Sequence, residues 1–415
     1  MRSRVLVAAL AVVALGVVAA TASASGNRVQ AKTLTVWLQV DAQSGWPDVV
    51  AAADQQFQTD HPGWTVNVQY QNWGDHLQKF DATLAGGNTP DVIEMGNTEM
   101  TKYMAAGAFA DITSSKSKFA NSSTWLKGLA ASGQFGGKVF GVPYYAGSRV
   151  VTYRTDLYKK AGIAKLPTSL AAFTADAQKL AAKNAKVKGF SPVYSAGTDW
   201  YFAMAFVYDF GGSIAKTHAG KWVGNLDSKQ SVAGLTAWKN FYKATSKAPA
   251  TSDENHPAPY DVYSQGQAGS IIGPGWFSCC VGKTYSAVTA QFVMPSHTAG
   301  QAMPGFLGGS DLAVPAPSGN QSQAVDWIAD FTNTASEKAL QAKGNIPNAT
   351  NLLGTSVNER AAARSWFVPA AKHWVDVENG NILRNMLTQI LTGKLSVLQA
   401  ASSASDNITS VLNGS

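Results

Sequence analysis

The stretch from Thr33 to Met95 alternates between two hydrophobic periods, and this alternation restricts the fold more than any other feature of the chain. Residues 33–40 and 64–70 carry the apolar patterns of strands, and 90–95 form a third apolar run. Between them, a segment that starts at Pro47 and the residues from 77 to 84 have apolar positions at helical spacing. Strand, helix, strand, helix and strand in succession predict a parallel α/β sheet, with residues 41–46 as a loop after the first strand.

The segment Gly136–Gly162 is predicted to be a hinge between two α/β lobes. Val139–Val142 is a short apolar run that ends at Pro143, and Val150–Tyr153 is a second one. Proline ends a central strand or lies at a sheet edge, because it cannot donate a ladder hydrogen bond. The residues between the two runs could absorb domain closure. An ordinary strand, turn and strand within one domain is the alternative interpretation.

Composition indicates a globular protein. The 415 residues are enough for two domains or one large one, and 45% hydrophobic with 14% charged residues does not indicate disorder. The formal charge is +7, but the lysines are scattered along the sequence. Because a nucleic-acid interface clusters its cations, we interpret the excess charge as a solvated surface and expect no nucleic-acid partner.

Met1–Ala24 has the pattern of a secretory signal peptide. Arg2 and Arg4 precede the apolar run 5–20, and Ala22-Ser23-Ala24 forms a small-residue cleavage site. We therefore expect an extracytoplasmic protein, secreted, periplasmic or at the cell surface. No cysteine lies near the cleavage site, so we expect no lipid attachment of the bacterial lipoprotein kind.

The sequence lacks the common catalytic motifs. It contains no GxSxG, HExxH or phosphate-binding loop ending in GK[ST], and its six histidines have no metal-like spacing. We therefore predict a non-enzyme with no catalytic residues, no cofactor and no metal. A secreted glycan-acting enzyme stays a less favoured alternative, because a glycosidase needs only two suitably placed carboxylates.

Aromatic residues point to a different function. The chain has 12 Trp, 13 Tyr and 17 Phe, and the apolar faces of sugar rings stack on such side chains. Trp238, Trp327 and most of Trp200–Phe210 have helical spacing and are interpreted as core. Trp276 instead follows Gly273-Pro274-Gly275 after an apolar run, so we predict that it lies at a loop tip and binds ligand.

Polar residues that follow the predicted parallel strands are further candidates, because ligands bind outside the carboxyl ends of such strands. Asn97 and Glu99 follow the run 91–95, and Asp41, Gln43 and Trp46 follow the first strand. Helix capping is the alternative role for Asn97.

Both cysteines of the chain are adjacent, at Cys279 and Cys280. Exported proteins meet oxidising conditions, but neighbouring Cα atoms lie about 3.8 Å apart, below the usual disulfide range of about 4.4–6.8 Å. A strained vicinal disulfide that stiffens the Trp276 loop and two free buried thiols are the two interpretations.

Eight segments, in order, resemble the extracellular solute-binding proteins of ABC importers, in the class that binds sugars and maltodextrin-like oligosaccharides. Each is weakly specific alone, and together they span nearly the whole mature chain. They are Pro90–Thr113, Gly141–Gly162, Pro167–Leu180, Gly211-Gly212, Gly273–Trp276, Gly308–Asn333, Gly344–Pro347 and Gly393–Leu412.

The resemblance implies a periplasmic-binding-protein-like α/β fold, with two lobes, three hinge crossings and a ligand cleft between the lobes. The crossings are expected near Pro143–Gly147, Gly305–Gly309 and Asn345–Ala349. The N-terminal lobe would comprise 33–143 and 309–344, and the C-terminal lobe 147–305 and 348–415. It also implies a monomer that captures a sugar by hinge closure and delivers it to the permease subunits of an ABC importer.

The resemblance also supports individual binding residues. Trp276 would match a stacking tryptophan of the family, and Asp199, Trp200 and Tyr201 a polar and aromatic contact region. Tyr145 and Arg149 flank the first crossing, Ser310 and Asp311 lie at the second, and Trp374 lies where relatives often present another aromatic. A non-sugar solute, such as a peptide, polyamine or sugar phosphate, is the alternative ligand. An anionic ligand would need paired cations in the cleft, for which Arg149 is the one candidate.

Overall fold

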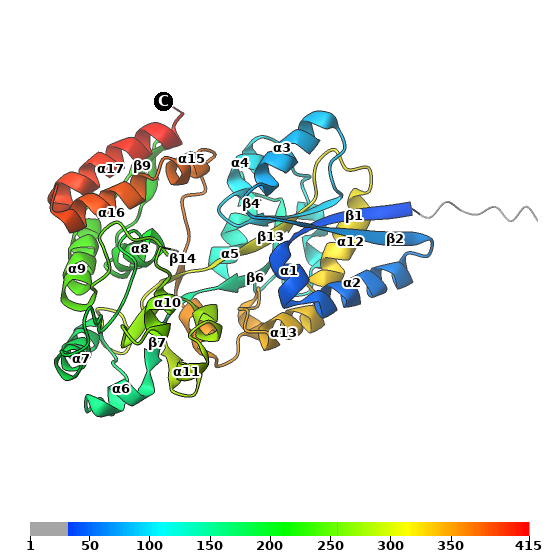
Figure 1. Ribbon diagram of the computed structural model, residues 1–415. Helices are drawn as coiled ribbons and strands as arrows, with labels where there is room; N and C mark the ends of the chain where they lie inside the picture. The colour runs from blue at the N-terminus through cyan, green and yellow to red at the C-terminus, as the bar shows by residue number, and fades with distance from the viewer. Residues whose placement is uncertain (1–31, 255, 415) are drawn as a thin grey trace, which may run out of the picture.

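The computed structural model describes residues 32–254 and 256–414, apart from the side chain of Cys279. The predicted signal peptide, residues 1–24, lies outside this part. The chain forms two α/β lobes that lie side by side and are joined by several strands and loops (Figure 1). Among the described residues, we find no helix with the length and apolar character needed to cross a membrane.

The N-terminal lobe is built on a five-stranded sheet of order β2-β1-β3-β13-β6. Strands β1 (Lys32–Gln39), β2 (Trp64–Gln71) and β3 (Val92–Gly96) are parallel, whereas β13 (Gly308–Ala313) and β6 (Gly141–Gly147) are antiparallel to their neighbours. The predicted parallel α/β unit is therefore confirmed. The helices of this lobe are α1 (Val40–Gly45), α2 (Pro47–Asp60), α3 (His76–Gly86), α4 (Met100–Ala105), α5 (Lys127–Ser132), α12 (Gln321–Phe331) and α13 (Thr334–Ala342), with 3₁₀ turns at Thr113–Lys118 and Thr350–Leu352 and a hairpin of β4 (Gln134–Phe135) and β5 (Lys138–Val139).

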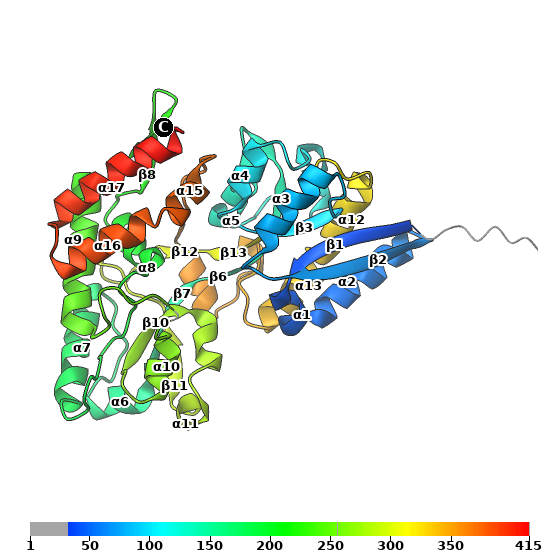
Figure 2. The ribbon, with the colours of Figure 1, turned by 45° about the horizontal axis from the view of Figure 1, so that its top comes forward.

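The C-terminal lobe contains a three-stranded antiparallel sheet, in which β7 (Arg149–Arg154) lies between β10 (Ser270–Pro274) and β11 (Thr289–Phe292). Most of its mass is helical (Figure 2). Its helices are α6 (Thr155–Lys160), α7 (Leu170–Lys183), α8 (Trp200–Asp209), α9 (Lys229–Thr245), α10 (Pro259–Ser264), α11 (Lys283–Ser286), α14 (Val357–Ala362), α15 (Trp374–Asn379), α16 (Ile382–Thr392) and α17 (Val397–Leu412), with a 3₁₀ turn at Gly275–Cys279, a hairpin of β8 (Ala215–His218) and β9 (Lys221–Gly224), and a parallel pair of β12 (Gly305–Phe306) and β14 (Ser365–Trp366).

Each lobe has its own hydrophobic core. One large cluster fills the C-terminal lobe and includes Trp238, while two clusters of the N-terminal lobe include Trp327 and Phe80. Trp238 and Trp327 are fully buried, as their helical spacing predicted. Separate cores are what hinge bending requires, because each lobe keeps its packing while the other moves.

Three segments pass between the two sheets. Strand β6 of the five-stranded sheet continues through Ser148 into β7 of the other sheet, and β12 leads into β13. The third segment runs beside the first: Ile346 and Ala146 exchange backbone hydrogen bonds of 2.7 and 3.0 Å, and the Asn348 side chain donates to Pro143 O at 2.9 Å. These bonds couple the first and third segments, so we expect them to bend together.

Two local predictions were wrong. Residues 41–46 are not a loop, because Val40–Gly45 forms the short helix α1. Pro143 does not end its strand, since β6 extends from Gly141 to Gly147. The strand tolerates proline because β6 is an edge strand and its pairing with β13 is irregular between Ser310 and Asp311.

Candidate ligand-binding cleft

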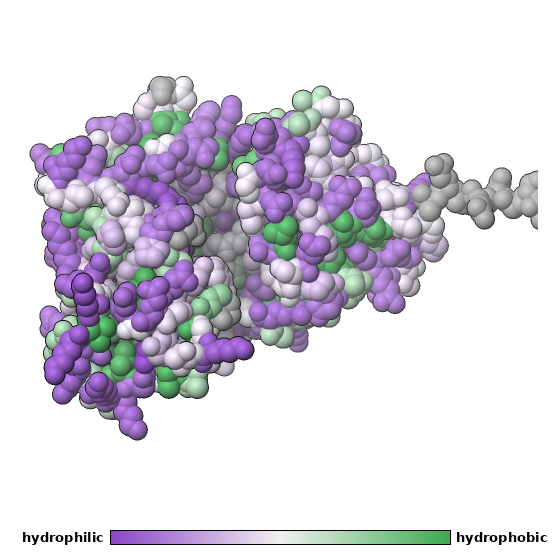
Figure 3. Space-filling model, in the orientation of Figure 1, coloured by the Kyte–Doolittle hydropathy of each residue, from purple (hydrophilic) through white to green (hydrophobic). Residues whose placement is uncertain are grey.

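A groove separates the two lobes at the surface (Figure 3). On the N-terminal side, the carboxyl ends of β1, β2 and β3 are followed by Asp41, Trp73 and Glu99. The Trp73 indole N–H donates to Asp41 Oδ2 at 2.6 Å, and its ring is 38% exposed. Asp41 and Glu99 therefore lie at the edge expected for residues that follow parallel strands. Trp73 follows β2 in the same way, although it was not among the predicted site residues.

His76 connects Trp73 to Glu99. Its Nε2 lies 2.9 Å from Glu99 Oε2, and its Nδ1 lies 3.0 Å from the carbonyl oxygen of Trp73. Both partners are acceptors, so both ring nitrogens must carry hydrogen while Glu99 is ionised. Burial lowers the pKa of His76, but the hydrogen bond and charge of Glu99 outweigh it and raise the pKa above its ordinary value. The two hydrogen bonds of His76 thus tie the backbone that carries Trp73 to Glu99.

A buried carboxylate lies behind this edge. Glu94 on β3 accepts the backbone N–H of Gln39 at 2.8 Å, and burial raises the pKa of Glu94 to about 7. Its Oε1 has no hydrogen-bond partner among the described residues. Glu94 therefore links the ends of β1 and β3 beneath the cleft surface.

The C-terminal side of the cleft carries an ionic cluster centred on Arg149. The guanidinium donates to Asp199 Oδ2 at 2.9 Å and to Glu254 Oε1 at 2.6 Å, and it lies 4.5 Å from the centroid of the Tyr201 ring. Burial raises the pKa of Glu254 to about 7 against the opposing charge of Arg149. Asp199 also caps α8, since its Oδ1 accepts the Phe202 N–H. Two nitrogens of the Arg149 guanidinium, Nε and Nη2, are thus paired with carboxylates.

Glu378 approaches the N-terminal lobe from α15, which packs against α4. Burial raises the pKa of Glu378 to about 7, and the negative charge of Glu99 in the opposite lobe adds to this effect. The Thr98 hydroxyl and the charge of Arg384 act in the opposite direction. The charge of Glu99 is thus felt by Glu378 across the boundary between the lobes.

Trp276 is 56% exposed at the start of the loop after β10, as predicted. Its ring lies 5.9 Å from that of Tyr260 and 4.8 Å from that of Phe277. The loop is held in place by Gln291, whose amide donates to Gly275 O at 2.7 Å. The Gly275 N–H donates to Ser148 O at the first crossing, so this aromatic surface lies beside the hinge.

Four predicted site residues are buried inside the N-terminal lobe, and a fifth, Tyr145, is half-buried beside them. Trp46 packs on Tyr145 with ring centroids 5.1 Å apart, and Asn97 donates to Leu307 O at 2.6 Å. Ser310 and Asp311 are fully buried on β13, and Ser310 Oγ lies 3.4 Å from the Tyr145 hydroxyl. Their observed roles are packing and support of the second crossing; ligand contact through them stays a prediction.

The predicted aromatics of the C-terminal lobe form a stack. The Trp200 and Tyr201 rings lie 3.8 Å apart, and Phe306 lies 4.7 Å from Tyr201. Trp200 and Trp374 are buried, so neither offers an open ring face, whereas Tyr201 is half-buried beside Arg149. Ligand contact by Trp200 and Trp374 stays a prediction, as it does for Gln43, which is exposed on α1.

The structure adds Trp73, Glu254, Glu378 and Tyr260 to the candidate residues. Trp73 could have been found from its position after a parallel strand, but Glu254 and Glu378 lie in segments without a motif. The side chain of Cys279 lies outside the described part, so the disulfide with Cys280 and the two free thiols stay alternative predictions. Among the described residues, no group of His, Cys, Asp and Glu is arranged to hold a metal ion.

Comparisons with known proteins agree with this architecture. Residues 38–338 match the family described as "Bacterial extracellular solute-binding protein". The diacetylchitobiose-binding protein DasA of Streptomyces coelicolor is 32% identical over 375 residues, covering 88% of this chain and 86% of that protein. A lactose-binding protein of Rhizobium radiobacter is 24% identical over 297 residues, covering 68% and 66% of the two chains.

Solved structures resemble the fold as well. The cyclic α-maltosyl-1,6-maltose-binding protein of Arthrobacter globiformis aligns with a TM-score of 0.78 at 16% identity, covering 92% of this chain and 99% of that one. The sugar-binding protein MalE of Xanthomonas citri aligns with a TM-score of 0.77 at 17% identity, covering 92% and 98%. From its two-lobed fold, its cleft and the match over most of its length, the chain belongs to the bacterial extracellular solute-binding proteins.

Proposed function

We propose that this protein captures an oligosaccharide between its lobes and delivers it to the permease of an ABC importer. The observation that carries the proposal is the pair Trp73 and Trp276. They are the two aromatic side chains that the described part of the chain leaves exposed, and each lobe presents one of them beside the cleft. Flat apolar rings next to carboxylates suit sugars, which have apolar ring faces and outward hydroxyl groups.

The charges of the cleft favour a neutral ligand over a sugar phosphate. Arg149 is already paired with Asp199 and Glu254, and Arg384 lies near Glu254 and Glu378. An anionic ligand would have to displace one of these carboxylates, at a desolvation cost. Asp41, Glu99 and Glu378 are instead suited to accept hydrogen bonds from sugar hydroxyls. The proposal includes no catalytic step.

We further propose that closure bends the three segments near 143–147, 305–309 and 345–349, with lobes of 33–143 plus 309–344 and 147–305 plus 348–415. The two large hydrophobic cores support a division into two lobes, but Ala349 and Leu352 pack with the N-terminal core, which favours a third boundary after residue 352. The family supports an extracytoplasmic location, and the sequence pattern of residues 1–24 supports export by a signal peptide. We propose a monomer, by the family resemblance.

Isothermal titration calorimetry tests the ligand class. The probes are N,N′-diacetylchitobiose, lactose and maltose, with glucose 6-phosphate as the anionic comparison. We expect saturable binding of at least one neutral sugar and at least a tenfold weaker Kd in Trp276→Ala, a loss of about 1.4 kcal/mol. Trp222→Ala, on the β8–β9 hairpin, is the control and should bind normally. Binding of the phosphate alone, or equal affinity in Trp276→Ala, would contradict the proposal.

A further inference from the structure

The two lobes carry opposite charge. Residues 32–143 and 309–344 contain nine lysines and 14 acidic residues, whereas 147–305 and 348–415 contain 21 basic and 12 acidic residues. The first group has a net charge of −5 and the second of +9. The positive charge that is scattered along the sequence therefore belongs to one lobe, and a surface of that lobe should attract anions.

More than half of the excess lies between residues 155 and 190, which contain seven lysines and two aspartates. All seven lysines are exposed: Lys159, Lys160, Lys165, Lys179, Lys183, Lys186 and Lys188. Both aspartates are already paired, Asp156 with Arg154 at 2.7 Å and Asp176 with Lys179 at 2.9 Å. We call this surface, made by α6, α7 and the segments that follow each of them, the basic face.

Exposed hydrophobic side chains lie at both ends of α7 within the basic face. Leu166 precedes the helix and is 42% exposed, and Val187 follows it and is 41% exposed. Between them, the exposed side of α7 carries small residues and lysines at helical spacing: Ala171, Ala175, Gln178, Lys179, Ala182 and Lys183. The helix spans about 21 Å. Figures 1 and 2 both place α6 and α7 on the outside of the C-terminal lobe, away from the other lobe.

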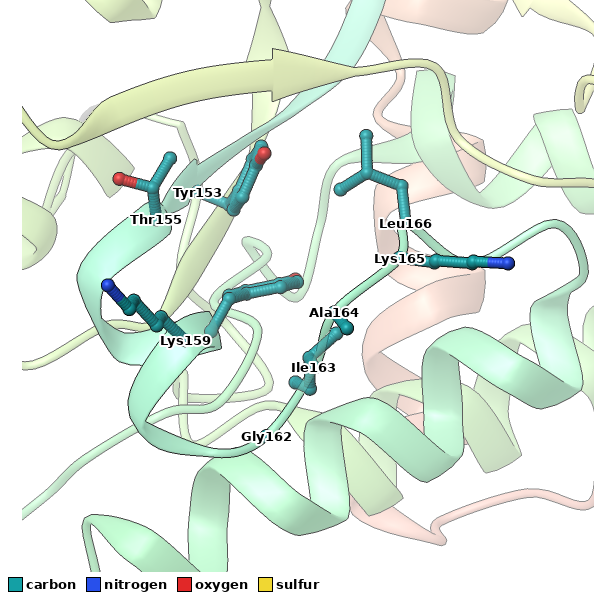
Figure 4. Close-up of a pocket in the computed structure, with 9 residues that line it drawn as sticks. Tyr153, Thr155, Lys159, Gly162, Ile163, Ala164, Lys165 and Leu166 are labelled. Carbon is teal, nitrogen blue, oxygen red and sulfur yellow. The ribbon is translucent and has the colours of Figure 1, made fainter.

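A cavity of about 370 Å³ opens in the same face, between α6 and the loop before α7. Tyr153, Tyr158 and Ile163 give it an apolar lining, and Leu166 lies at its edge. Figure 4 shows Lys159 and Lys165 on opposite sides of the cavity, with their amino groups directed away from it. An apolar group in this cavity would therefore be flanked by positive charge on both sides.

We propose that the basic face docks on the surface of a membrane that contains anionic phospholipid. Lysine ammonium groups would lie at the level of the lipid phosphates, while Leu166, Val187 and the alanine stripe of α7 contact the acyl boundary. The apolar face of α7 itself is buried in the core of the lobe, so the binding would rest on the attraction of the lysines to anionic headgroups, with Leu166 and Val187 adding a small apolar contact. A soluble polyanion would satisfy the lysines but would leave the exposed leucine and valine without a partner.

Vesicle cosedimentation of the mature protein tests the proposal. We expect binding to phosphatidylcholine vesicles with about 30 mol% phosphatidylglycerol, little binding to pure phosphatidylcholine, and loss of binding in about 0.5 M NaCl. Lys159→Gln with Lys165→Gln should weaken binding about 25-fold, since each lysine near an anionic surface contributes about fivefold. Lys216→Gln with Lys221→Gln removes the same charge from the β8–β9 hairpin and should leave binding unchanged.

Leu166→Asp should also weaken vesicle binding, while sugar binding measured in parallel stays unchanged in every variant because the cleft is not altered. Equal binding to neutral and anionic vesicles, or an equal loss in the hairpin control, would overturn the proposal. Binding to soluble polyphosphate without binding to vesicles would also overturn it, in favour of a polyanion partner.

Discussion

Replacing Arg149 by methionine should destabilise the protein strongly, because it leaves two carboxylates without their cation. The Asp199 side chain is only 2% exposed, so water cannot replace the lost partner, and that of Glu254 is 27% exposed. Breaking a buried ion pair from one side costs about 3–5 kcal/mol. For a lobe of this size, that lowers the midpoint of thermal unfolding by roughly 6–20 °C.

Arg154→Met is a matched control at the other end of the same strand. Arg154 also makes an ion pair and lies 3.7 Å from an aromatic ring centroid, that of Tyr285. Its partner Asp156 is 42% exposed, so the free carboxylate would be solvated. We therefore expect a cost of about 1–2 kcal/mol from the exposed pair and the cation–π contact.

Urea denaturation of the ligand-free protein, followed by circular dichroism, compares the two variants. Arg149→Met should lose at least about 2 kcal/mol more free energy of unfolding than Arg154→Met. Adding Asp199→Asn to Arg149→Met should recover part of the loss, because asparagine is neutral and can still accept the Phe202 N–H at the start of α8. Equal losses in the two single variants, or no recovery in the double variant, would refute the reasoning.

Three further predictions concern the hinge and the cleft. Burial raises the pKa of Asp311 from 3.8 to about 7, so the folded state holds a proton that the unfolded chain has released. The Asp311 carboxyl alone should therefore lower the free energy of unfolding by about 2–3 kcal/mol as the pH rises from about 5 to 8. Denaturation experiments at the two pH values should show a smaller decrease for Asp311→Asn than for the unchanged protein. Gly309→Ala should lower the free energy of unfolding by about 1–3 kcal/mol, since its Cβ would lie 2.0 Å from Tyr145 O. Gly308→Ala is the control and should leave it unchanged, because its Cβ would lie 3.4 Å from the nearest atom. Equal unfolding midpoints of the two variants would contradict this prediction. Trp73→Ala should weaken sugar binding in calorimetry without changing the unfolding midpoint, and unchanged affinity would remove Trp73 from the site.

Sequence periodicity determined much of the architecture. The alternating periods between Thr33 and Met95 specified three parallel strands and two helices, because each period buries one face of its element. A local rule also holds at the start of α7, where the Ser169 hydroxyl caps the helix by accepting the Ala172 N–H. Pro143 lies within an edge strand, which is one of the two positions that the proline rule allows, but the sequence does not tell an edge strand from a central one. That distinction depends on β13, which comes from residues about 165 positions later.

The candidate site was only partly accessible from sequence. Asp41 and Glu99 were predicted at the cleft edge because each follows a parallel strand, and all three parallel strands end at one edge of the sheet. Burial separated Trp276, which the fold leaves exposed, from Trp374, which is 1% exposed in a hydrophobic core. The turn residues before Trp276 indicated its exposure, whereas nothing in the sequence around Trp374 indicated its burial, because that depends on the distant segments that pack against the ring.

Only the tertiary structure decided which charges meet. Asp199 and Glu254 lie 50 and 105 positions after Arg149 in the sequence, yet both pair with its guanidinium and the three form one cluster. The exposed lysines between 155 and 190 are brought together by α6 and α7, which contact each other within one lobe. Local periodicity sets which face of each element is buried, whereas electrostatic neighbours are set by the long-range packing of those elements.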